Sequence, residues 1–481
     1  MAMMTKEEYV SSLKALDHRV FVLGEEIESV VDHPVSRPPA MAMAETYRQA
    51  ELEETGTQFT TRSNITGDMI NRFTHIQHSL EDLVKKIIML REMGRKTACC
   101  FQRCAGLDCM NTLYAVTYDI DQAFGTPYHG RFVDFMEHIQ SNDLVSAACM
   151  TDSKGDRGLS PSEQADKDQY VHIVEEKKGG IVVRGAKLHI TGAVNSHELI
   201  VVPTRALSEK DRDYAVAFAI PAETDGVTYI YGRQPSDTRR LEESPSDVGN
   251  LYYGGCEAMV VFDDVFVPEE RIFMKGEFSF AGPLVELFAA HHRASYGGCK
   301  VGVGDVLIGA TAAIAEAQGT HRSAHVKDKL AEMVHLNETL HAGALASAGK
   351  GYKTASGAYA VDPLLANVCK LNVTRFPFDI ARMAQDIAGG ILVTMPSLKD
   401  RENPHIGPYV KKYLVGKDGV DSEKRIRILR LIENITLGTG AVSYMTESIH
   451  GAGSPQAQKI MITRLADLES AKAMAFHLCG I

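Results

Sequence analysis

The amino-acid sequence predicts an α+β fold, with an N-terminal helical domain at residues 1–143, a central β-domain at 144–275 and a C-terminal helical bundle at 276–481. Two patterns support this prediction. Toward both ends of the chain, apolar residues recur every three or four positions, as on the buried face of a helix. Between them, short β-rich runs alternate with polar residues, glycine and proline.

The N-terminal region, residues 5–139, is expected to be mainly helical. Its clearest signal is a set of apolar residues at spacings of three and four with charged residues between them: Ile76, Leu80, Leu83 and Ile87. This spacing is typical of an amphipathic helix with one apolar face. The first third of the chain is therefore predicted to form a helical unit.

The central region is expected to form a small β-domain. Its β-rich runs are separated by turn-forming residues and lie at 170–174, 181–183, 199–202 and 214–220. It closes with the apolar run 259–267 and Pro268, after which helical periodicity returns.

The C-terminal region has the spacing of a helix bundle. Apolar residues form a stripe over 326–344, and residues 365–388 and 425–437 have a similar pattern. Residues 396–423 are rich in proline, glycine and charge, so we expect a long loop there.

Composition narrows the classes of function. The formal net charge of -11 argues against nonspecific binding to nucleic acid or an anionic membrane. We see no run of about 18 apolar residues, so no membrane span is predicted. The N-terminus lacks a signal-peptide pattern, and an odd count of nine cysteines indicates a reducing compartment. We therefore expect a cytoplasmic protein, in which an anionic ligand would need a local basic pocket.

Two motifs in the central region are candidates for flavin binding. The first, ACMTDSKGDR, spans 148–157, and the second, GAKLHITGA, spans 185–193. Each alone reads as a strand leading into a polar turn. Followed by the run at 260–268, they resemble the middle domain of the acyl-CoA dehydrogenase superfamily. The resemblance implies an acyl-CoA dehydrogenase-like fold and bound FAD, with Thr151, Thr191 and Arg157 as candidate cofactor-binding residues.

A glycine pair near residue 390 is a further candidate for FAD binding. The segment QDIAGG, ending at Gly389 and Gly390, resembles the superfamily's element near the adenosine half of FAD in a neighbouring subunit. A helix C-cap explains the pair equally well. The resemblance implies a homotetramer with FAD sites at subunit interfaces.

Two segments carry a possible metal-binding set. They are CFQRC, at 100–104, and HRASYGGCK, at 292–300. If helical, Cys100 and Cys104 would share one face about 6 Å apart, and His292 and Cys299 would lie about 10.5 Å apart unless the helix broke at the intervening glycines. Three thiolates and one imidazole suit either zinc or an iron–sulfur cluster, and all four residues could also be ordinary buried ones.

The same two segments resemble those of the 4-hydroxybutyryl-CoA dehydratase family, which binds a [4Fe–4S] cluster through three cysteines and one histidine. The resemblance implies that the ligands are Cys100, Cys104, His292 and Cys299. Neighbours that a shift in register would substitute are Cys99, Cys109 and His291. Candidate catalytic residues in matching segments are His292, Glu257, Glu447, Tyr296 and Lys300.

The family resemblance implies dehydration of 4-hydroxybutyryl-CoA to crotonyl-CoA by flavin-mediated radical chemistry, with the cluster as Lewis acid, and an accompanying vinylacetyl-CoA Δ-isomerase activity. His292, as the only nitrogen ligand, is expected to act also as a base, with Glu257 or Glu447 handling the other proton. The main alternative is a two-component flavin-dependent aromatic monooxygenase without a cluster. An ordinary acyl-CoA dehydrogenase and a non-enzymatic flavin- or zinc-binding protein are further alternatives.

Overall fold

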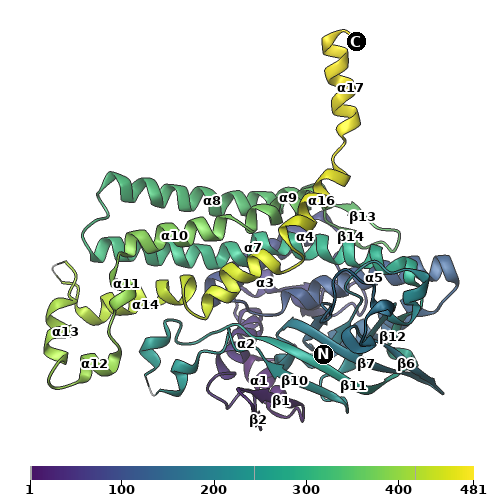
Figure 1. The fold of residues 1–481 in the computed structure, drawn as a ribbon, viewed down its shortest axis with the longest axis horizontal. Helices are drawn as coiled ribbons and strands as arrows, with labels where there is room; N and C mark the ends of the chain where they lie inside the picture. The colour runs from purple at the N-terminus through teal and green to yellow at the C-terminus, as the bar shows by residue number, and fades with distance from the viewer. Residues whose placement is uncertain (1–2, 243, 418) are drawn as a thin grey trace.

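The computed structural model describes residues 3–242, 244–417 and 419–481. Long helices form one layer of the molecule, and the strands with the N-terminal helices lie along its other side (Figure 1). The expectation of a mixed fold of helices and sheets is confirmed.

The N-terminal region contains the expected helices. They are α1 (Lys6–Lys14), α2 (Arg37–Glu51), α3 (Gly56–Phe59), α4 (Leu80–Thr97), α5 (Cys104–Phe124) and α6 (Tyr128–Ser141). In α4, Ser79 caps the N-terminus by accepting a hydrogen bond from the backbone N–H of Asp82, and Leu83 and Ile87 are buried as the spacing predicts. This helix and α5 lead directly into the site described below.

The prediction of a mainly helical N-terminal region is wrong for residues 19–27. These residues form β1 (Arg19–Val22) and β2 (Glu25–Ile27), which extend a six-stranded sheet of order β2-β1-β10-β11-β7-β6. The other strands of this sheet are β6 (His172–Lys177), β7 (Gly180–Thr191), β10 (Val227–Tyr231) and β11 (Glu257–Pro268). Strand β1 pairs in parallel with β10, and its Val20 and Val22 are buried, so pairing with distant residues stabilises a strand of only four residues.

A second sheet has the order β12-β9-β8-β5. Its strands are β5 (Ser146–Cys149), β8 (Glu198–Val201), β9 (Val216–Pro221) and β12 (Ile272–Lys275). One hydrophobic cluster includes buried residues of both sheets and of α1, α2, α5 and α6. Two short hairpins, β3 (Thr60–Arg62) with β4 (Met69–Asn71) and β13 (Tyr352–Lys353) with β14 (Tyr359–Ala360), complete the strands.

The C-terminal region is built around α7 (Ala281–Ala317), a continuous helix of 37 residues. The helix break that Gly297 and Gly298 could have allowed does not occur. These glycines instead let neighbouring helices approach, because a Cβ at Gly298 would lie 2.7 Å from the carbonyl oxygen of Ile87 in α4. Around α7 lie α8 (Ala324–Gly349), α9 (Pro363–Val373), α10 (Phe376–Ala388) and α14 (Ser422–Thr436).

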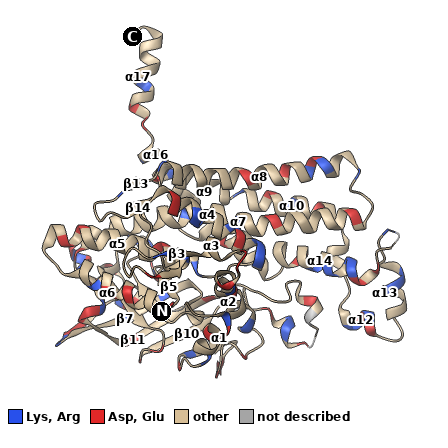
Figure 2. Ribbon diagram, turned by 180° about the vertical axis from the view of Figure 1, so that it is seen from behind, with Lys and Arg blue, Asp and Glu red and all other residues tan. Residues whose placement is uncertain are grey.

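Helix α7 is also apolar and long enough to cross a membrane, as judged by the segment Phe278–Ala317. However, 67% of its most apolar window is buried inside the protein, as expected for a core helix. Figure 2 shows acidic and basic residues interspersed along the helices and loops rather than gathered by sign.

The long loop predicted at 396–423 contains two short helices, α12 (Leu398–Glu402) and α13 (Gly407–Tyr413), and is preceded by α11 (Ile391–Thr394). A reciprocal cap between Ser397 and Asp400 starts α12, which explains the local departure from a loop. The chain ends with the π-helix η10 (Val442–Thr446), α15 (Glu447–His450), α16 (Pro455–Leu465) and α17 (Leu468–Cys479). Helix α17 stands away from the rest of the chain (Figure 1).

Candidate active site

Three of the cysteines singled out in the sequence lie together where α4, α5 and α7 meet. Cys104 and Cys299 form a hydrogen-bonded thiol pair that raises the pKa of Cys104 and lowers that of Cys299, and Cys100 interacts with both. Burial raises the pKa of Cys100 well above its usual value. Because these thiols lie in an enclosed environment, a bound cation would be needed to hold them all as thiolates.

The geometry expected for Cys100 and Cys104 is wrong. Cys104 is the first residue of α5, but Cys100 lies in the loop between α4 and α5, so the two do not share one helical face. Gln102, in this loop, has a φ of 68°. Its side chain donates to the carbonyl oxygen of Pro39 at 2.9 Å and accepts from Asn195 at 2.7 Å, which holds the loop in place.

His292 projects from α7 beside this group. Its Nδ1 lies 2.8 Å from Oδ2 of Asp108 on α5, and its ring stacks on Phe288 and meets the ring of Tyr296 edge-on. Because Asp108 occupies Nδ1, Nε2 is the nitrogen available to a ligand. The neighbours that a shift in register would substitute as ligands have different surroundings. Cys99 borders a separate cleft, and the Nδ1 of His291 is buried without a hydrogen-bond partner among the described residues.

Within residues 3–242, 244–417 and 419–481, no three or more His, Cys, Asp or Glu side chains are arranged to hold a single metal ion. The thiols and His292 therefore do not form a compact zinc site. Ligands of a multi-iron cluster bind different irons and so lie farther apart than ligands of one ion.

Two glutamates lie close to the cysteines and to each other. The Thr191 hydroxyl donates to Oε1 of Glu257 at 2.6 Å, and the Lys300 ammonium donates to Oε2 of Glu447 at 2.7 Å. Burial raises the pKa of Glu257 well above its usual value, and the negative charge of Glu447 raises it further. Glu257 is thus held neutral, whereas Glu447 is held in an ion pair with Lys300. This difference allows one carboxyl to act as an acid and the other as a base.

Tyr296 lies between two buried lysines. The ammonium groups of Lys300 and Lys370 lie 5.1 and 4.8 Å from the centre of its ring. Burial raises the pKa of the Tyr296 hydroxyl, so it remains a proton donor. Burial also lowers the pKa of Lys370 to about 7, with a further contribution from the charge of Arg293. Sequence reasoning missed Lys370, whose only signal is a lysine among the apolar residues of α9.

The candidate flavin residues gather where β5 and β7 meet. The Thr151 carbonyl accepts from the backbone N–H of Leu188 at 2.7 Å, and Thr191 contacts Glu257 as described. Burial lowers the pKa of His189, and the charges of Lys154, His450 and Arg157 act in the same direction. The turn that carries Arg157 therefore lies near α15, which carries Glu447.

Within one chain, Gly389 and Gly390 do not lie beside the candidate flavin residues Thr151, Thr191 and Arg157. They follow α10, and a Cβ added at either would meet nothing within 4 Å. Gly389 has a φ of 82° and its N–H donates to the carbonyl of Gln385, so the pair ends a helix in this chain.

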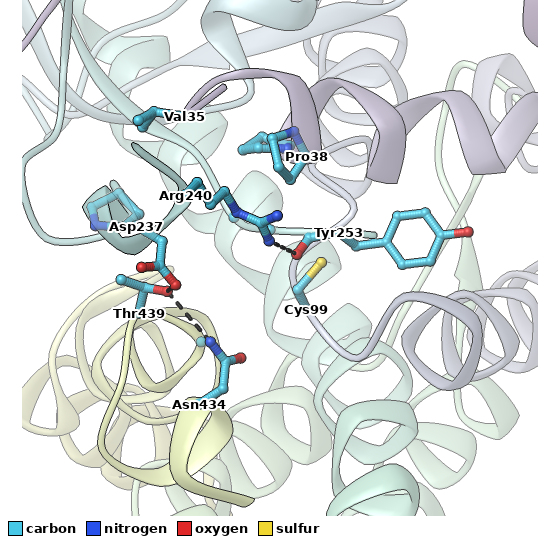
Figure 3. Close-up of a pocket in the computed structure, with 13 residues that line it drawn as sticks. Val35, Pro38, Cys99, Asp237, Arg240, Tyr253, Asn434 and Thr439 are labelled. Atoms are coloured by element: carbon cyan, nitrogen blue, oxygen red, sulfur yellow. Dashed lines mark hydrogen bonds between the residues drawn. The ribbon is translucent and has the colours of Figure 1, made fainter. Parts of the chain in front are cut away.

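A cleft of about 330 Å³ opens beside the site. Figure 3 shows Cys99, Arg240 and Tyr253 on one side, and Asp237, Thr439 and Asn434 on the other. Gly254 and Gly255, which are separated from Glu257 in the chain by Cys256 alone, also line it. The cleft thus reaches the segment that carries a candidate catalytic carboxyl.

Two family models match the chain: 4-hydroxyphenylacetate 3-hydroxylase N terminal over residues 5–274, and its C terminal over 281–480. The chain belongs to the 4-hydroxyphenylacetate 3-hydroxylase family. The break between the two matched regions falls just before α7. The models do not separate residues 1–143 from 144–275, so the three-domain division stays a prediction.

Relatives within the 4-hydroxyphenylacetate 3-hydroxylase family differ in their sequence identity to this chain. The 4-hydroxybutyryl-CoA dehydratase/vinylacetyl-CoA-Δ-isomerase of Clostridium aminobutyricum is 52% identical, over 100% of both chains. The oxygenase component of 4-hydroxyphenylacetate 3-monooxygenase from Thermus thermophilus is 26% identical, over 91% of this chain and 89% of the relative. The expected resemblance to 4-hydroxybutyryl-CoA dehydratases is confirmed.

Solved structures of the family agree with this ranking. An oxygen-tolerant archaeal 4-hydroxybutyryl-CoA dehydratase from N. maritimus superposes with a TM-score of 0.98 at 51% identity, covering 100% of this chain and 95% of that one. The oxygenase component (HpaB) of 4-hydroxyphenylacetate 3-monooxygenase, complexed with FAD, gives a TM-score of 0.85 at 23% identity, covering 99% and 98%. The similarity to HpaB shows that the two chains share a fold.

Proposed function

We propose that this chain is a 4-hydroxybutyryl-CoA dehydratase that converts 4-hydroxybutyryl-CoA to crotonyl-CoA and also has vinylacetyl-CoA Δ-isomerase activity. The observation that carries the proposal is the 52% identity over the whole chain to a protein of that name. The convergence of three thiols, His292 and two glutamates with different environments supports it. The monooxygenase alternative is less well supported, because those relatives are only 22–27% identical.

The chain's own residues suggest how protons are moved. A thioester makes the C2 proton acidic, and we assign its removal to Glu447, which is paired with the Lys300 ammonium. We assign the C3 proton to His292 through Nε2, since its Nδ1 is bonded to Asp108. The neutral Glu257 then protonates the departing hydroxyl, so that it leaves as water. Of the two removed protons, one returns to C4 and the other restores the acid form of Glu257.

Two groups would complete this site. FAD is supported by the FAD complex of the related HpaB, and Thr151, Thr191 and Arg157 would contact it. Cys100, Cys104, Cys299 and His292 would hold a [4Fe–4S] cluster, a role that suits three enclosed thiols and an imidazole backed by a carboxylate. When bound, the flavin supplies one-electron chemistry and the cluster a Lewis-acidic iron.

We also propose a cytoplasmic homotetramer with FAD sites at subunit interfaces. All nine cysteines are free, in keeping with a reducing compartment. Helix α17 exposes Leu468, Met474 and Phe476 although a 12-residue helix is marginally stable alone, so a second copy of the chain is its expected partner. The exposed Gly389 and Gly390 would face FAD of a neighbouring subunit.

The test is purification without oxygen, followed by measurement of iron, acid-labile sulfide and flavin per chain and of turnover of 4-hydroxybutyryl-CoA. About four irons, four sulfides and one FAD, with crotonyl-CoA formed, are expected for a [4Fe–4S] flavoenzyme. Cys104→Ser should lose the iron, whereas Cys149→Ser, at another buried free cysteine, should keep it. Flavin without iron in the unchanged protein would instead favour the monooxygenase.

A further inference from the structure

Beside the candidate site lies a buried ion pair, of which the proposed chemistry uses only the contact between Asp108 and His292. Lys86 on α4 and Asp108 on α5 are 1% and 0% exposed, and the Lys86 ammonium donates to Oδ1 of Asp108 at 2.9 Å. The other oxygen, Oδ2, lies 2.8 Å from the Ser295 hydroxyl and 2.8 Å from Nδ1 of His292, both on α7. All four hydrogen-bonding groups thus come from the three helices that bring the cysteines together.

A fully buried ion pair is an unusual feature to retain for stability alone. Removing two charges from water costs free energy that their attraction often fails to recover, and apolar residues of similar size can stabilise a core as well or better. The pair does, however, present an ionised acceptor at a fixed position. Of the two adjacent histidines, only His292 hydrogen-bonds to this acceptor in the described part of the chain, whereas the Nδ1 of His291 is buried without a hydrogen-bond partner there.

We propose that Asp108 is a positioning residue for His292: it accepts a hydrogen bond from Nδ1–H, fixes the tautomer and orientation of the ring, and directs the lone pair of Nε2 toward Cys100, Cys104 and Cys299. Lys86 keeps Asp108 ionised and in place. A carboxylate behind a histidine ligand raises its basicity and prevents the ring from turning. This inference rests on the proposed function for the identity of the bound group.

The test compares three variants reconstituted with ⁵⁷Fe without oxygen. Asp108→Asn keeps the size of the side chain but removes its charge. Ser295→Ala is the matched control, because it removes the other hydrogen bond to the same oxygen and leaves the contact with His292. Lys86→Met/Asp108→Leu removes both charges together, so that no unpaired charge is left in the core if the single variant fails to fold.

Each protein is compared for iron and sulfide per chain, for the rate at which a chelator removes iron, and for its Mössbauer spectrum. In Asp108→Asn and the double variant we expect iron removal to be about 10-fold faster or more. The signal of one iron in four should change, which general loosening of the fold would not produce. Ser295→Ala should match the unchanged protein in both respects.

Two outcomes would overturn the inference, and they are distinguishable. If the unchanged protein holds iron but Asp108→Asn retains its iron and its spectrum, Asp108 does not position His292 and the proposed function stands. If the unchanged protein holds flavin but no iron, the proposed cluster and the inference both fall.

Discussion

Replacing Gly302 by alanine should separate α4 from α7 and release the iron of the proposed cluster before the chain unfolds. A Cβ at Gly302 would lie 2.8 Å from the Cα of Gly94 and 2.8 Å from the backbone nitrogen of Arg95. These are backbone atoms of α4, which cannot rotate away, so we expect a cost near 3 kcal/mol, the upper part of the usual range for overpacking. The better helix propensity of alanine returns about 1 kcal/mol, which leaves a net destabilisation of about 2 kcal/mol.

Gly309 provides the control, since it lies on the same helix and a Cβ there would meet nothing within 4 Å. Gly309→Ala should therefore stabilise the protein by about 1 kcal/mol. The assay compares thermal unfolding at one scan rate with iron release during heating. If Gly302→Ala is as stable as Gly309→Ala and keeps its iron equally well, the close packing of α4 on α7 does not hold Cys299 in place.

The remaining predictions concern the site. Activity should fall as pH rises through the raised pKa of Glu257, because the acid form is lost; Glu257→Gln should remove this alkaline decline and lower kcat about 10²–10⁴-fold. Glu447→Gln should lower kcat by a similar factor without loss of iron, and full activity would exclude it as the base. Lys300→Met should destabilise the protein by about 3–5 kcal/mol, because its side chain and that of Glu447 are only 4% and 15% exposed; Lys300→Met/Glu447→Gln should recover part of this loss, and an unchanged melting temperature would contradict the buried pair. His292→Cys should impair both iron retention and turnover, and a variant that kept both in full would rule out the ligand-and-base role.

The sequence predicted the parts of the fold that depend on local pattern. The apolar spacing at Leu83 and Ile87 marks a helix because every third or fourth side chain faces the core. Strand β1 could not be found this way, since its four residues are stabilised by pairing with β10, some 200 residues later in the chain. The role of the glycines in α7 was left open by the sequence, because a glycine that breaks a helix and one that admits a neighbouring helix look alike there.

Only part of the candidate site could be predicted from the sequence, for a related reason. Cys104 and Cys299 come from motifs, and the structure brings them together. Asp108 and Lys86 were missed because nothing in their own segments distinguishes them from charged residues on a helix surface; only the packing of α4, α5 and α7 makes them a buried pair. The FAD contact proposed for Gly389 and Gly390 would lie in a second subunit, and within this chain the pair ends α10.

The uninterrupted course of α7 fixes the spacing of two of the four candidate ligands, whereas a third, Cys100, is placed by a loop. His292 and Cys299 are seven residues apart on one helix, so their backbone separation is set at about 10.5 Å by helical rise alone. Cys100 lies on a loop whose position depends on side-chain contacts from Gln102. If the chain holds the proposed cluster, changes in this loop and its contacts should therefore alter the placement of Cys100, while α7 keeps the backbone spacing of His292 and Cys299 fixed.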